Sequence, residues 1–207
     1  MESPLVENNQ DPLIEKNQDP FKLFSNWYND AIKNEINDPN AMNVATVSSD
    51  MQPTSRMIKL INFDENGFVF NTNVESKKSL AIKSNNLIAL NFHWKSLRRQ
   101  VRIEGKAMIL TEKEADDIFY DFPYEKQIIV WSSKQSEILP NRKILNKRIS
   151  DYQEYFNDHQ LVRPYNWSGY RVVPKYFEYW WEVESKPFYR LAYKKNKDKW
   201  ESYDLYP

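Results

Sequence analysis

Cysteine is absent from all 207 residues of the sequence. Its absence excludes disulfides, thiolate nucleophiles, zinc–thiolate sites and iron–sulfur clusters. Histidine is almost as scarce, since the only two, His93 and His159, lie far apart and lack the spacing of metal ligands. We therefore expect no metal site.

Glycine is also rare: Gly67, Gly105 and Gly169 are the only three, and each is isolated from the others. Dinucleotide-binding loops and Walker loops need clustered glycines, because their backbone amides must approach phosphate groups closely. Neither loop can be built from this sequence. A nucleotide-like cofactor would have to be held by side chains, which suits a cofactor with a single terminal phosphate.

The chain has no excess of either charge. Lysine plus arginine and aspartate plus glutamate both number 29, so the formal net charge is zero, which argues against nucleic-acid binding through bulk positive charge. No run of about eighteen uncharged apolar residues occurs, and the segment Met1 to Leu5 lacks the basic start of a signal peptide. We expect a cytoplasmic protein with neither a nucleic acid nor a membrane as its partner.

The N-terminal segment, residues 1–19, is polar and is predicted to be a flexible tail. Residues 20–207 are predicted to form a single domain. This domain begins with a helix, because apolar side chains recur at three- and four-residue spacing at Phe21, Phe24, Tyr28 and Ile32.

Most of the remaining chain has the pattern of strands. Strands are predicted at residues 42–47, 54–63, 67–72, 87–94, 100–110, 170–183, 189–194 and 199–206, with a hairpin turn at residues 64–67. Helices are predicted at residues 112–122, 124–133 and 140–156. Antiparallel strands with inserted helices indicate an α+β barrel rather than a doubly wound parallel sheet.

Eight short motifs occur in order along this chain. They are Asp19-Pro20-Phe21, Gln52-Pro53 followed by Arg56, Phe70-Asn71-Thr72-Asn73, Ser76-Lys77-Lys78, Arg99-Gln100-Val101, Trp131 to Ser136, Trp167 to Arg171, and Leu205-Tyr206-Pro207. In order and spacing they resemble the pyridoxine/pyridoxamine 5′-phosphate oxidase family, from about residue 19 to the C-terminus. The resemblance implies an FMN-binding split β-barrel, mainly antiparallel with peripheral helices. It also implies a homodimer with two FMN sites at the subunit interface.

The resemblance further implies which residues bind FMN. Arg56, Ser76, Lys77 and Lys78 match positions around the FMN phosphate, where a guanidinium, ammonium groups and a hydroxyl can satisfy a dianion without a glycine loop. The other implied cofactor contacts are Met57, Ile58, Ile61, Asn71, Thr72, Gln100, Gln135, Ser136, Trp180 and Arg190. Of these, Gln135 and Ser136 are implied to come from the partner subunit, and Asn71 departs from the aromatic residue usual in the family.

The substrate pocket departs from the family. The family binds the phosphate of vitamin B6 with a lysine, a tyrosine, an arginine and a serine, and an Arg-x-His pair positions the carbon that loses hydride. The corresponding residues in this chain are Ile61, Ile118, Phe122, Lys126, Lys186 and Phe188. Lys59 lies two residues before Ile61, so we expect the two side chains on the same strand face. We therefore expect a more apolar but still anionic substrate, bound by Lys59, Lys126 and Lys186 together with Ile118, Phe122 and Phe188.

The resemblance thus implies an FMN-dependent oxidase, in which hydride passes from the substrate to flavin N5 and then to O2. The altered pocket favours a small aromatic acid, as in phenazine biosynthesis, over a vitamin B6 phosphate. Two alternatives stay open: a true pyridoxine/pyridoxamine 5′-phosphate oxidase of PLP synthesis whose pocket has drifted, and a non-catalytic flavin-binding protein. We assign no catalytic acid or base.

Overall fold

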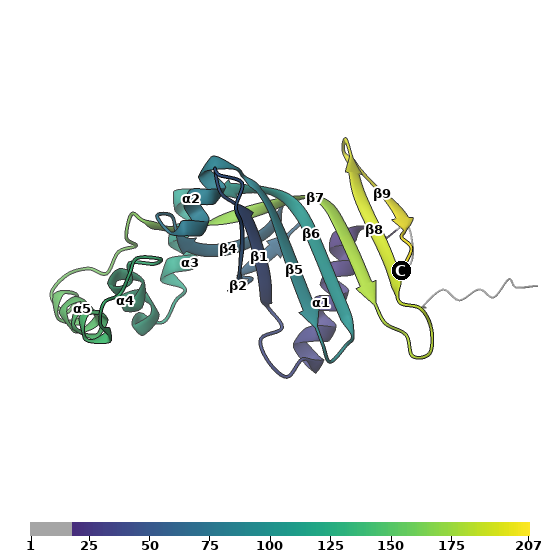
Figure 1. The fold of residues 1–207 in the computed structure, drawn as a ribbon. Helices are drawn as coiled ribbons and strands as arrows, with labels where there is room; N and C mark the ends of the chain where they lie inside the picture. Colours follow the sequence, from purple (N-terminus) through teal and green to yellow (C-terminus); the bar gives the residue numbers. More distant parts are fainter. Residues whose placement is uncertain (1–17) are drawn as a thin grey trace, which may run out of the picture.

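Residues 18–207 are described by the structure, a computed structural model, and they build one sheet of nine antiparallel strands (Figure 1). The predicted tail therefore lies almost wholly outside the described residues. The sheet order is β2-β1-β5-β6-β7-β4-β3, with β8 added to β7 and β9 to β8. The strands are β1 Ala41–Val47, β2 Pro53–Lys59, β3 Asn62–Asp64, β4 Gly67–Asn73, β5 Leu87–Trp94, β6 Arg99–Ile109, β7 Trp167–Trp181, β8 Tyr189–Asn196 and β9 Lys199–Asp204.

Five helices accompany the sheet within this part of the chain: α1 Pro20–Asn34, α2 Lys77–Ser84, α3 Glu112–Tyr120, α4 Tyr124–Ser132 and α5 Arg142–Tyr155. Helices α3 to α5 gather at the end of the molecule opposite β8 and β9 (Figure 1). Helix α2 was not predicted from the sequence. Within residues 18–207, no helix combines the length and the hydropathy needed to cross a bilayer.

Helix α1 begins where predicted. The Asp19 side chain accepts hydrogen bonds from the backbone N–H groups of Phe21 and Lys22, and Pro20 occupies the first turn, where its missing N–H costs nothing. The apolar face differs from the prediction, because Ile32 is 54% exposed. The residues that α1 buries are Pro20, Leu23, Phe24, Trp27 and Ala31.

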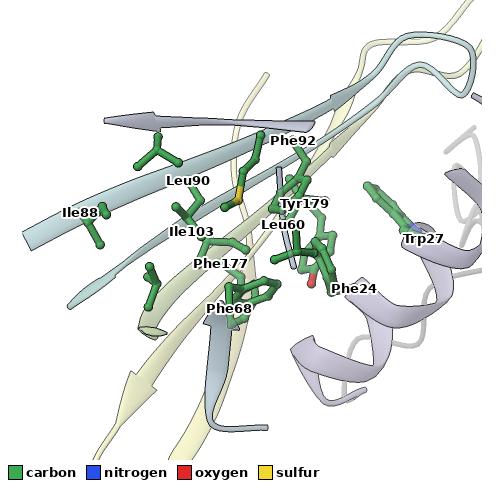
Figure 2. Packing of buried hydrophobic residues seen from close by; sticks show 14 of the residues in the cluster. Phe24, Trp27, Leu60, Phe68, Ile88, Leu90, Phe92, Ile103, Phe177 and Tyr179 are labelled. Carbon is green, nitrogen blue, oxygen red and sulfur yellow. The ribbon is translucent and has the colours of Figure 1, made fainter. Parts of the chain in front are cut away.

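An aromatic core joins α1 to the sheet (Figure 2). The Phe24 ring centroid lies 4.8 Å from that of Phe68 on β4 and 5.0 Å from that of Phe92 on β5. Trp27 meets Tyr179 of β7 edge-on, at 5.1 Å between centroids. These contacts link α1 to three strands, so the helix closes one face of the sheet.

The predicted strand 54–63 is two strands, and the single-strand prediction was wrong. Strand β2 pairs with β1, whereas β3 pairs with β4. At the break, the Leu60 N–H donates to Asn40 O and the Ile61 N–H donates to Val69 O, so consecutive residues bond to different neighbours. The buried Leu60 side chain anchors this crossing. The predicted turn at residues 64–67 is confirmed, with Gly67 at φ 135°.

Close packing of β4 against β7 requires a glycine at position 169. A Cβ atom there would lie 2.3 Å from Phe70 O and 2.9 Å from Leu110 Cδ1. We expect Gly169→Ala to lower the free energy of unfolding by about 2–4 kcal/mol, because the backbone oxygen can move only by parting the two strands. Urea denaturation measures this. Lys175→Ala, on an exposed position of β7, is the control and should change it by less than about 0.5 kcal/mol; equal effects would contradict the prediction.

Candidate cofactor site

Lys78 is the centre of a polar cluster between β4, α2 and the segment after α4. Its ammonium donates to Thr72 Oγ1 at 2.8 Å, Ser76 Oγ at 3.1 Å and Gln135 Oε1 at 2.8 Å. The residue is only 9% exposed. Residues far apart in the sequence therefore converge on one buried cation.

Arg56 of β2 lies within electrostatic range of Lys78. Its guanidinium donates to Val44 O at 3.0 Å, Thr46 Oγ1 at 2.9 Å and Thr54 Oγ1 at 2.6 Å. These neutral acceptors orient the guanidinium without neutralising it. The β1–β2 register, which sets Val44 opposite Arg56, brings them together.

The N-terminus of α2 completes this group. Lys77 is its first residue, and the Lys77 backbone N–H donates to Ser136 Oγ at 3.2 Å. Ser136 has φ 75°, a left-handed backbone conformation that is uncommon outside glycine and is concentrated at functional sites. A cavity of about 320 Å³ opens here, lined in part by Lys77, Gln135, Ser136 and the acidic residues Glu75 and Glu137. We call Arg56, Thr72, Ser76, Lys77, Lys78, Gln135 and Ser136 the cationic cluster.

One implied feature is corrected by this geometry. Gln135 and Ser136 were expected to come from a partner subunit, but both contact Lys77 or Lys78 of their own chain. The reason is that the chain after α4 returns to β4, where Gln135 Oε1 also accepts from the Asn73 backbone N–H at 3.3 Å. The cationic cluster is therefore built within a single chain.

The cluster carries uncompensated positive charge. Burial and, to a smaller extent, the nearby charge of Arg56 together lower the pKa of Lys78 to about 8. Among the described residues, none of Arg56, Lys77 and Lys78 forms an ion pair with a carboxylate. Two partly desolvated cations that face only neutral groups form a site suited to an anion.

A second group of predicted residues lies in one row across three strands. The register sets Gln100 of β6 opposite Trp180 of β7, and Trp180 opposite Arg190 of β8. All three are half-buried. The Trp180 ring also packs against Phe188, with centroids 5.5 Å apart. We call Gln100, Trp180 and Arg190 the Arg190 row.

Arg190 is held on two sides. Its Nε donates to Glu178 Oε1 at 2.9 Å, and its Nη1 donates to the carbonyl oxygen of Tyr206 at 3.0 Å. Burial alone would raise the pKa of Glu178, but the hydrogen bond from Arg190 and the charge of Arg102 together hold that pKa below its ordinary value. Glu178 is therefore charged and Arg190 stays fixed.

Not all predicted cofactor residues come together within one chain. The cationic cluster lies at the start of β7, where Thr72 of β4 pairs with Ser168, whereas the Arg190 row lies at the other end of β7, at Trp180. The remaining implied contacts flank the cationic cluster. Ile58 packs on the core, Met57 is 63% exposed, Asn71 precedes Thr72, and Ile61 lies in the break between β2 and β3.

The predicted substrate residues also fall into two groups. Lys126 of α4 places its ammonium 3.3 Å from the ring centroid of Phe122, and its pKa is lowered by burial and by the charge of Lys59. Phe122 packs against Trp167 at 5.4 Å, and Ile118 on α3 is half-buried. Lys186 and Phe188 lie instead between β7 and β8, near the Arg190 row.

Lys59 and Ile61 were expected on the same face of one strand. This prediction was wrong, because β2 ends at Lys59. Its ammonium forms an exposed ion pair with Asp38 at 2.6 Å. Lys59 is nevertheless close enough to Lys126 for the two charges to interact.

Sequence reasoning missed the residues that hold the predicted ones: Thr46 and Thr54 around Arg56, and Glu178 and the Tyr206 carbonyl around Arg190. It also missed Arg102, which contacts Glu178. A signal existed for Glu178, which is a single carboxylate within the aromatic run Phe177 to Trp181. A charged residue in such a strand indicates a buried partner.

Known structures define the class of this fold. PhzG from Burkholderia lata, solved in complex with tetrahydrophenazine-1-carboxylic acid, superimposes with a TM-score of 0.86 at 26% identity, covering 95% of this chain and 98% of that one. A pyridoxamine 5′-phosphate oxidase-related protein from Nostoc punctiforme gives a TM-score of 0.73 at 14% identity, covering 92% and 99%. The predicted α+β split barrel is confirmed.

Sequence comparisons define the family. A model described as pyridoxamine 5′-phosphate oxidase matches residues 28–156, and one described as the pyridoxine 5′-phosphate oxidase C-terminal dimerisation region matches residues 167–207. The pyridoxine/pyridoxamine 5′-phosphate oxidase of Mesorhizobium japonicum is 43% identical over 188 residues, 90% of this chain and 92% of that protein. The Trichormus variabilis enzyme is 39% identical over 188 residues, 90% and 88% of the two chains. The chain belongs to the pyridoxamine 5′-phosphate oxidase family and is an oxidoreductase of that type.

Proposed function

We propose that this protein binds FMN, with the phosphate on the cationic cluster. The observation that carries the proposal is the buried Lys78 ammonium, which faces three neutral oxygens beside Arg56 and has no carboxylate partner among the described residues. A phosphate dianion would supply the missing negative charge, and its oxygens would accept charge-assisted hydrogen bonds from both cations. The residues present therefore fit this cofactor.

We further propose that two chains share each flavin. Within one chain the cationic cluster and the Arg190 row lie at opposite ends of β7, at Ser168 and Trp180, which is roughly 40 Å along the strand, yet both groups match flavin contacts of the family. A homodimer would satisfy both assignments if the Arg190 row of one chain faces the cationic cluster of its partner. The match of residues 167–207 to a dimerisation region favours this arrangement.

The proposed reaction is an oxidation. FMN, when bound, accepts a hydride from a substrate C–H bond and passes the two electrons to O2, which leaves as hydrogen peroxide. The residues of this chain bind the phosphate, orient the ring system and supply charge beside it. Gln100 and Arg190 are the proposed ring-side contacts.

The proposed substrate is an anion more apolar than a vitamin B6 phosphate. Isoleucine and phenylalanine at positions 61 and 122 cannot donate to phosphate, whereas Lys126 and Lys59 bring positive charge to this side of the site. Phe122 and its neighbour Trp167 offer a flat aromatic surface. A small aromatic carboxylate suits this combination. PhzG from Burkholderia lata was solved with a carboxylic acid, tetrahydrophenazine-1-carboxylic acid.

A second candidate function is pyridoxine/pyridoxamine 5′-phosphate oxidation itself. It is favoured by 43% identity over 90% of the chain to the Mesorhizobium enzyme of that name. Purified protein separates the candidates. We expect a yellow dimer whose flavin is bleached under anaerobic conditions by an aromatic carboxylate substrate but barely by pyridoxamine 5′-phosphate. Fast bleaching by pyridoxamine 5′-phosphate would select the second candidate, and a colourless protein that fails to bind added FMN would reject both.

Flavin affinity should depend on pH through Lys78. Its pKa is lowered to about 8 in the free protein, and a bound phosphate dianion would raise it. The protonated form therefore binds more tightly, so affinity is full well below pH 8 and falls as the pH rises through 8. We expect the FMN dissociation constant to increase about tenfold between roughly pH 7 and 9. Fluorescence titration measures it. Lys78→Arg, which stays protonated, should flatten the profile; an unchanged slope would contradict this assignment.

A further inference from the structure

Glu178 is a buried carboxylate that the proposed function does not use. It is 4% exposed in the middle of β7, and three side chains converge on it. Arg190 Nε donates to Oε1 at 2.9 Å, while Arg102 Nη1 and the Tyr176 hydroxyl each donate to Oε2 at 3.1 Å. Burying a carboxylate is costly unless it is fully hydrogen-bonded, as this one is.

We propose that Glu178 is a positioning residue, which fixes the Arg190 guanidinium in the orientation that contacts flavin. This inference rests on the proposed function, in which Arg190 binds FMN. Glu178 lies two residues before Trp180 on the same face of β7, and Trp180 is directly opposite Arg190. The Arg190 side chain must therefore lie along the sheet, diagonally across the β7–β8 pair, to reach Glu178.

The hydrogen bonds on Arg190 leave a defined part of it free. A guanidinium has five N–H donors in a planar fork. Glu178 takes the Nε donor, and the Tyr206 carbonyl takes one donor of Nη1. Nη2 forms no hydrogen bond or ion pair with residues 18–207, so within this part of the chain that edge of the fork is available to a ligand. With both ends held, Arg190 loses little side-chain entropy when it binds.

Charge supports the same role. Glu178 lies between two guanidiniums, those of Arg102 and Arg190, and Arg102 also reaches Glu104 at 3.7 Å. The Glu178 carboxylate thus stabilises the protonated Arg190 and also forms an ion pair with Arg102. Glu104 contacts Arg102 but makes no ion pair with Arg190 among the described residues, so it offers a matched control on the neighbouring strand.

The test is a double-mutant cycle on FMN affinity in the full-length dimer. Glu178→Gln keeps the shape of the side chain and removes its charge. In the wild-type background we expect it to weaken FMN binding about tenfold, and in the Arg190→Ala background less than about twofold, because residues acting through one another are non-additive. The flavin visible absorption band should shift in Glu178→Gln but not in the Glu104→Gln control.

Several results would overturn the inference: equal weakening in both backgrounds, no weakening in either, or an equal loss in Glu104→Gln. Thermal unfolding of each variant shows that it is folded. If Glu178→Gln does not fold, Glu178→Asp replaces it in the double-mutant cycle. Failure of the proposed function would look different, since wild-type protein would then not bind FMN at all.

Discussion

The Lys78→Met variant is expected to bind FMN about 100-fold more weakly than wild type, because a charge-assisted hydrogen bond to a buried phosphate contributes up to about 3 kcal/mol. Methionine has a similar length and fills the same space without the charge. The Lys78 ammonium has three neutral partners, Thr72, Ser76 and Gln135, so its removal leaves no carboxylate unpaired. Titration of the flavin-free protein with FMN measures the loss.

The stability of the flavin-free protein should not fall in Lys78→Met, although its FMN affinity does. Burial and the charge of Arg56 both disfavour the protonated Lys78 in the free protein. Removing that charge should leave the melting temperature of the flavin-free protein unchanged or higher. Lys83→Met, on an exposed position of the same helix, is the matched control and should affect neither quantity. Unchanged FMN affinity in Lys78→Met would exclude the cationic cluster as the phosphate site.

The Ile61→Lys/Phe122→Arg variant is expected to oxidise pyridoxamine 5′-phosphate with a kcat/KM at least on the order of 100-fold above wild type. Each restored cation can form a charge-assisted hydrogen bond of about 1.5–3 kcal/mol with the substrate phosphate. Ile61 is 36% exposed in the break between β2 and β3, so a lysine there needs no repacking of the core. Peroxide formation under steady-state conditions is the measurement.

The uncharged variant Ile61→Leu/Phe122→Leu is the control for this gain. Phe122 packs against Trp167, so its replacement disturbs an aromatic contact, and the control carries the same disturbance without the charge. The single variant Ile61→Lys should give part of the gain with Phe122 intact. Wild-type protein that already turns over pyridoxamine 5′-phosphate efficiently would contradict the altered pocket and support the second candidate function.

Much of the fold follows from local patterns. The strand at residues 87–94 matches β5 to the residue, and every second side chain along it is buried. The break at Leu60 was not predictable in this way, since Leu60 and Ile61 continue an apolar pattern while their backbone groups bond to different strands. Ile32 was misplaced for a related reason: spacing alone does not show that Trp27 and Ala31, rather than Ile32, face the core.

The site was predicted less completely than the fold. The resemblance identified Arg56, Lys78 and Gln135, and the structure brings all three into one neighbourhood. Their supporting partners depend on strand register, which a single sequence does not show. Thr46 holds Arg56 only because β1 and β2 pair with Thr46 opposite Thr54. Likewise, Glu178 reaches Arg190 across the β7–β8 ladder.

The separation of the cationic cluster from the Arg190 row has a thermodynamic consequence. If each flavin needs one group from each chain, then cofactor and second subunit act as reciprocal effectors of one another. If bound flavin increases the association constant of the two chains by some factor, association of the chains must increase the affinity for flavin by the same factor. Dilution below the dissociation constant of the dimer would then release cofactor without any chemical change, and cofactor supply would set how much of the protein is assembled.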